Sequence, residues 1–78
     1  MLKPDEVLEK DYLDTRCMLL EIAATLDRLD RAAEREHHPV PRADRRLREI
    51  YRSLELLAEQ DTTADRVERL LNLFSDLD

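Results

Sequence analysis

The sequence predicts an all-α fold, a three-helix antiparallel bundle with a long first helix, completed as a homodimer. Three segments repeat apolar residues at the three- and four-residue spacing of an amphipathic helix, and the first does so for about eight turns. The 78-residue chain contains no glycine, and its 42% of apolar residues include only three aromatic ones. The core therefore has to be built from leucine and isoleucine on helices.

The first helix is expected at residues 4–36. Pro4 suits the first helical position, because the N–H that proline lacks would be unpaired there. Pro39 and Pro41 cannot continue a helix, so the chain is expected to reverse at this point. One apolar row, here called the first stripe, follows the whole helix: Leu8, Tyr12, Thr15, Leu19, Ile22, Leu26, Leu29 and Ala33.

Two shorter helices are expected at residues 41–60 and 63–77. The apolar spacing slips by one residue between them, which indicates a break rather than one continuous helix. Thr62, with Asp65 three residues later, approximates a capping box at the start of the last helix. Short connections favour an antiparallel arrangement. The sequence leaves open whether the two helices fold back on each other or lie end to end along the first.

A second apolar row makes the middle of the first helix apolar over more than half of its circumference. This second row consists of Leu13, Cys17, Leu20 and Ala24. At 1.5 Å per residue the first helix spans roughly 50 Å and the others less than about 30 Å. If the two shorter helices fold back on each other, they cover only its C-terminal half. We therefore expect association with a second copy, or with a helical protein partner, through a predicted interface that consists of Leu8, Tyr12, Leu13, Cys17, Leu20 and Ala24.

Composition argues against several classes of function. The net charge of −6 opposes wholesale attraction to nucleic acid or to an anionic membrane surface. The longest apolar run, residues 17–20, is far shorter than the ~20 residues that span a bilayer. A lone cysteine and an N-terminus without a secretion-signal pattern favour the cytoplasm. The sequence thus predicts a single helical domain over residues 1–78, without a cofactor, that serves as a self-associating interaction module rather than as an enzyme.

An enzyme remains the alternative, because three arginines share one face of the second helix: Arg45, Arg48 and Arg52. Guanidinium groups suit phosphate and carboxylate, so these side chains are candidates for binding an anion in a pocket between two chains. The competing interpretation is a solvated surface with paired charges. Acidic residues lie three or four positions from each arginine, and Asp44 is expected to pair with Arg48.

A metal site is the second alternative. Glu34 and His37 have the Glu-x-x-His spacing that places a carboxylate and an imidazole on one face of a helix, as in di-iron bundles. Such sites need two of these motifs, so a dimer would have to supply the second copy. No metal is predicted from one motif. Glu34 and His37 are the candidate ligands, and Asp44 is a further one if a dimer supplies the second copy.

The order of one long and two shorter helices resembles that of the small all-helical chorismate mutases. The likeness includes Pro39-Val40 before an arginine-rich helix, and Val67, Leu70 and Phe74 in the last helix. The resemblance implies an intertwined dimer that holds a dicarboxylate with arginines and a lysine. The only lysines here are Lys3 and Lys10, at the N-terminus, so the likeness is one of architecture.

Overall fold

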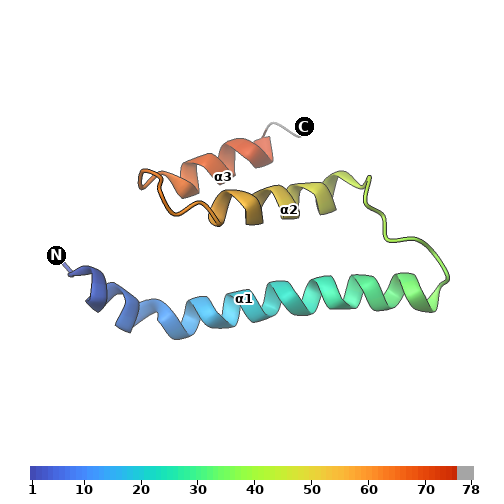
Figure 1. Ribbon diagram of the computed structural model, residues 1–78, viewed down its shortest axis with the longest axis horizontal. Coiled ribbons are helices and arrows are strands. Elements are labelled where there is room, and N and C mark those ends of the chain that lie inside the picture. The colour runs from blue at the N-terminus through green and yellow to red at the C-terminus, as the bar shows by residue number, and fades with distance from the viewer. Residues whose placement is uncertain (76–78) are drawn as a thin grey trace. The chain divides into compact units, whose positions relative to one another are not determined.

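The computed structural model describes residues 1–75, which form three helices and no strand (Figure 1). The helices are α1 (Pro4–Arg35), α2 (Arg45–Leu57) and α3 (Arg66–Ser75). The predicted all-α class with three helices is confirmed. The chain divides into two compact units, Met1–Val40 and Pro41–Asp78. The antiparallel packing of all three helices and the dimer remain predictions.

The first unit consists of α1 and its flanking residues. The helix begins at Pro4, as predicted. The Lys3 N–H donates a hydrogen bond to Glu6 Oε1 at 3.3 Å, and the Lys3 carbonyl accepts the first helical bond from the Val7 N–H at 3.0 Å. Glu6 therefore satisfies one of the unpaired N–H groups at the N-terminus, and its charge is favourable next to the positive end of the helix dipole.

The C-terminus of α1 is closed by a turn that uses histidine where glycine is usual. His37 adopts a left-handed conformation with a φ of 55°. The His38 N–H donates to the Ala33 carbonyl at 2.9 Å, and the His37 N–H donates to the Glu34 carbonyl at 3.2 Å. These two bonds make up a Schellman motif, which satisfies carbonyl groups that the helix end leaves unpaired. The predicted helix end at residue 36 is confirmed to within one residue.

The start of α2 differs from the prediction of residue 41. The Asp44 N–H donates to the Pro41 carbonyl at 3.0 Å, which closes a turn before the helix. Asp44 is then the N-cap of α2, and its Oδ1 accepts from the Arg46 N–H at 2.8 Å. The helix begins at Arg45 because this carboxylate satisfies the first N–H groups from outside the helix.

The Asp44 carboxylate also binds the side chain of Arg46, rather than that of Arg48 as predicted. Arg46 Nε donates to Oδ1 at 3.1 Å, and a terminal guanidinium nitrogen donates to Oδ2 at 2.9 Å. These side-chain bonds, together with the bond from the Arg46 backbone, lower the pKa of Asp44 from 3.8 to about 2. The carboxylate in turn raises the pKa of the Arg46 guanidinium.

This shift predicts an acid-sensitive start of α2. Because the pKa of Asp44 is depressed in the folded chain, its stabilising effect is complete above about pH 4 and is lost as the pH falls towards 2. We expect Asp44→Asn, which keeps a capping side chain, to abolish this component. The measurement is helicity by circular dichroism from pH 5 to pH 2 for both proteins, with the two curves subtracted because other carboxylates titrate in the same range. Parallel curves would contradict the prediction.

The connection between α2 and α3 is held by arginines of α3. Arg69 donates to Glu59 Oε2 at 3.0 Å and to Thr62 Oγ1 at 3.1 Å, and Arg66 donates to the Glu59 carbonyl at 3.3 Å. These bonds engage both the backbone and the side chain of Glu59. They explain why α2 ends at Leu57 rather than at the predicted residue 60.

The start of α3 also differs from the prediction. The capping box at Thr62 does not form, because the Thr62 hydroxyl accepts from Arg69. The helix begins at Arg66, and the Asp65 carbonyl accepts its first bond, from the Arg69 N–H at 3.0 Å. Asp65 Oδ1 is buried and has no hydrogen-bond partner among the described residues. The predicted end at residue 77 lies outside the described residues.

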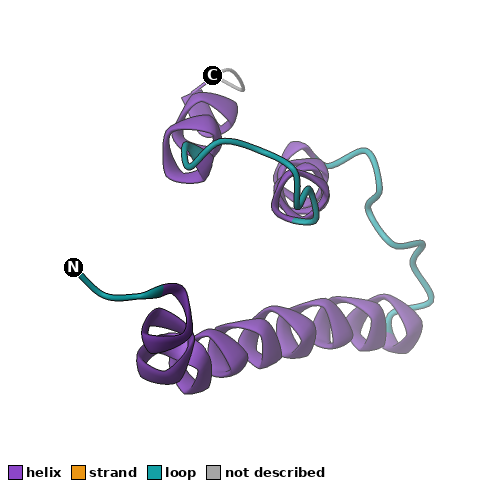
Figure 2. Ribbon diagram, turned by 60° about the vertical axis from the view of Figure 1, so that its left-hand side comes forward, coloured by secondary structure: helices purple, strands orange, loops and turns teal. Residues whose placement is uncertain are grey.

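Helices α2 and α3 lie side by side in both views (Figures 1 and 2) and form a helical hairpin. The chain therefore folds back at residues 58–65, and the end-to-end alternative for these two helices is wrong. Leu47 is the single buried residue of the described chain, at 7% exposure. Among the described residues of the hairpin, the half-buried leucines are Leu54, Leu56, Leu70 and Leu73.

Candidate functional site

Helix α1 carries two apolar rows and has no buried residue among its 32. All six residues of the predicted interface are exposed. Leu13 exposes 66% and Leu20 exposes 56% of its surface, so the second row is in solvent along its length. Soluble proteins bury most large aliphatic side chains, and a continuous exposed row of them is typical of a surface that contacts another chain.

The exposure of the first stripe varies along the helix. Its members in the C-terminal half of α1, from Ile22 to Ala33, are half-buried, whereas Leu8, Tyr12 and Leu19 are exposed. The exposed part of the first stripe, which ends at Leu19, therefore overlaps along α1 with the first part of the second row, Leu13 and Cys17. Where the two rows overlap, α1 exposes apolar residues on two sides.

A shallow depression marks the exposed part of the first stripe. It is lined by Tyr12, Thr15, Arg16, Leu19, Leu20 and Ala23. Thr15 lies in the first stripe between the larger Tyr12 and Leu19, and its hydroxyl donates to the Asp11 carbonyl at 2.9 Å. Since this hydroxyl is satisfied within the helix, it leaves no unpaired polar group in the depression. The sequence pattern does not predict this depression, because helical spacing places Thr15 in the first stripe whatever the size of its side chain.

The hairpin also exposes large apolar residues. Val67 exposes 72% and Leu71 exposes 59% of its surface, and Tyr51, Leu57 and Phe74 are exposed as well. Each of the two units thus presents apolar surface to solvent. The hairpin alone, with one buried residue, has a very small core for a folded unit.

The anion-binding role of Arg45, Arg48 and Arg52 stays a prediction, and all three lie in α2. A depression on the hairpin brings together Arg48 and Arg52, but it includes Arg42 in place of Arg45. Arg42 lies in the turn before α2. The sequence predicted a helix from residue 41, and helical spacing does not place Arg42 next to Arg48. No described residue forms an ion pair with Arg42, Arg48 or Arg52.

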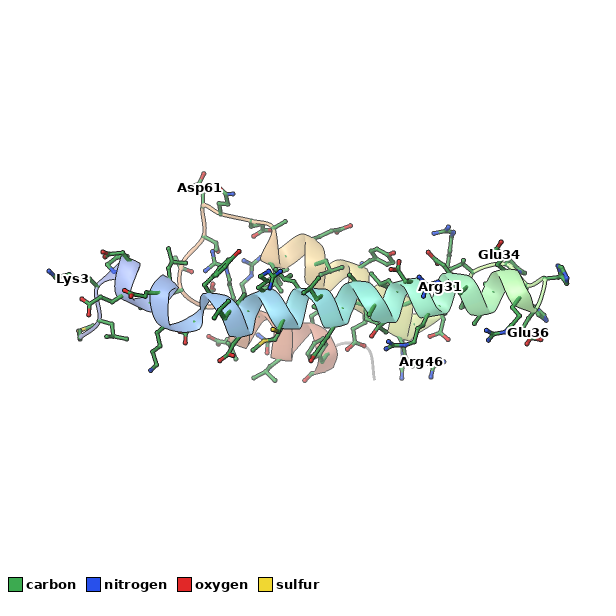
Figure 3. The ribbon with its side chains drawn as sticks, turned by 90° about the horizontal axis from the view of Figure 1, so that it is seen from below. Lys3, Arg31, Glu34, Glu36, Arg46 and Asp61 are labelled. Atoms are coloured by element: carbon green, nitrogen blue, oxygen red, sulfur yellow. The ribbon has the colours of Figure 1, made fainter. Side chains whose placement is uncertain are left out.

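The candidate metal ligands lie at the end of α1. Glu34 is in the last turn (Figure 3), whereas His37 is outside the helix in the left-handed turn. The 34–37 spacing therefore does not place the two side chains on one helical face. In the part of the chain that the structure describes, no three His, Cys, Asp or Glu side chains form a group suited to a metal ion. Cys17 is a free, exposed thiol on the second row.

None of the helices in residues 1–75 is long and apolar enough to cross a membrane. Comparisons with protein-family models, with curated proteins and with solved structures give no match. The likeness to the chorismate mutases therefore remains one of helix order alone. What this chain does has to be argued from its own surface.

Proposed function

We propose that the chain is a self-associating helical module whose working surface is the predicted interface on α1. The observation that carries this proposal is that none of the 32 residues of α1 is buried, although the helix bears two rows of large apolar side chains. Isolated helices gain little stability in water from propensity alone, and most helical stability in proteins comes from packing an apolar face. A second chain would provide that packing.

The lengths of the helices support a partner for the N-terminal half of α1. At 1.5 Å per residue, the 32 residues of α1 extend about 48 Å, whereas the 13 residues of α2 extend about 20 Å. One hairpin therefore covers less than half of α1. We propose that the C-terminal half of the first stripe packs against a hairpin of α2 and α3 as an antiparallel bundle. A second copy of the chain then covers the N-terminal half of α1.

Sedimentation of the unmodified protein tests the proposal. We expect a homodimer, with twice the 9.2 kDa mass of the chain, at micromolar concentration. The dimer should dissociate on dilution with a concomitant loss of helicity, because folding and association are coupled when neither unit has a complete core. A stable and fully helical 9.2 kDa monomer at high micromolar concentration would rule the proposal out.

A further inference from the structure

The depression on α2 is basic and partly apolar. Its lining consists of Arg42, Leu47, Arg48, Tyr51, Arg52 and Glu55. Three positive charges face one negative charge, and none of the arginines is neutralised by an ion pair with a described residue. In a chain with a net charge of −6, this depression is suited to an acidic partner that also carries apolar side chains.

The N-terminal part of α1 has the complementary character. Residues 5–14, here called the acidic arm, contain five acidic residues and a single lysine. No ion pair of the described residues involves the arm. Asp5, Glu9 and Tyr12 follow one another at spacings of four and three residues, so they share one face of the helix, and Tyr12 is exposed. The arm thus combines negative charge with an uncovered aromatic side chain.

We propose that the acidic arm of one chain docks in the basic depression of a second copy, and that the reciprocal contact forms in a two-fold symmetric dimer. This inference rests on the proposed self-association and adds the place where the hairpin of the second chain binds. Opposite charges at the contact would fix the register of the two chains, while the apolar lining and Tyr12 supply burial.

The length of the chain limits the contact between Glu9 and Arg42 within one molecule. Arg42 follows the end of α1 at Arg35 by seven residues, which reach at most about 25 Å when fully extended. Glu9 lies 26 residues before Arg35 on a straight helix, at a distance of about 39 Å. The left-handed turn at His37 shortens the reach of the connection further. Glu9 therefore lies beyond the backbone reach of Arg42 in the same chain, which favours another copy as the partner at this position.

Two charge-reversed chains test this contact. The first carries Arg48→Glu and Arg52→Glu in the depression, and the second carries Asp5→Lys and Glu9→Lys in the arm. Each variant alone has two repulsive contacts per dimer, so we expect its dimerisation to weaken on the order of a hundredfold or more. In an equimolar mixture, one contact of the mixed dimer pairs the introduced lysines with the introduced glutamates and the other is native. The mixture should therefore dimerise about as well as the unmodified protein.

Native mass spectrometry, which separates the mixed dimer from either homodimer, provides the measurement, with sedimentation for the affinities. The matched control for the depression variant is Arg28→Glu with Arg35→Glu, which changes the net charge by the same amount as that variant, on α1 outside the arm, and should leave the dimer intact. If the unmodified protein is dimeric while either variant dimerises equally well, or while mixing fails to restore the dimer, the docking proposal is overturned and self-association stands. If the unmodified protein is monomeric, both proposals fail together.

Discussion

A chain that carries both Leu13→Glu and Leu20→Glu is expected to sediment as a 9.2 kDa monomer. Both side chains are more than half exposed, so the substitutions leave no cavity within the chain. In the proposed dimer each would place a carboxylate in an apolar contact, which costs several kcal/mol per unpaired charge and offsets the gain of apolar burial. Sedimentation at several concentrations measures the association, and circular dichroism measures helicity at the same concentrations.

A matched control separates this effect from a general increase in negative charge. Val67→Glu with Leu71→Glu adds the same charges at two positions four residues apart on α3, where the side chains are at least as exposed. These residues lie outside the predicted interface, so we expect the control chain to remain dimeric. Unchanged mass and unchanged helicity in the Leu13 and Leu20 variant would show that the second row is not a contact surface. Dissociation of both variants would extend the interface to α3.

The first helix could be predicted nearly to the residue because its signals are local. Pro4 marks the start, and the proline-rich segment after it ends the helix whatever the rest of the chain does. The turn at His37 was not predicted. The left-handed position that closes a helix is usually recognised by its glycine, and this chain has none.

The limits of α2 and α3 could not be predicted, because contacts between distant residues determine them. Glu59 ends α2 where it binds Arg66 and Arg69, which are seven and ten residues further along the chain. The same contacts use the hydroxyl of Thr62, which otherwise looks like a cap. At the other end of α2, Asp44 could cap the helix or pair with Arg48 in the sequence pattern. The structure selects the cap and a pair with Arg46.

The candidate sites also divide into one that local sequence signals predict and one that they do not. Apolar periodicity is sufficient to identify the two rows of α1, because it depends only on helical spacing. The second row is exposed along its length, whereas the first stripe is exposed only as far as Leu19. Which arginines line the depression on the hairpin depends on where α2 starts. A start at Arg45 leaves Arg42 in the preceding turn, where it joins Arg48 and Arg52, and no periodicity argument covers a residue outside the helix.

The second large effect is expected for Leu47→Ala. Leu47 is the single buried residue of the described chain, at 7% exposure, and truncation of a buried leucine costs about 2–5 kcal/mol through lost transfer free energy and the cavity that remains. A domain of this size has a free energy of unfolding of only about 4–12 kcal/mol. We therefore expect the variant to lose a large part of its stability, and its helical hairpin to be partly unfolded at 37 °C.

Urea unfolding followed by circular dichroism measures the loss, at one fixed chain concentration because association adds to the apparent stability of a dimer. The control is Leu57→Ala, the same substitution on the same helix at a side chain that is 45% exposed, for which we expect a loss below about 1 kcal/mol. A small effect at Leu47 would contradict its role as the centre of the hairpin core. Equal and large losses at both positions would mean that the exposed face of α2 is buried in the associated protein, so that its stability comes from contacts between chains rather than from Leu47 alone.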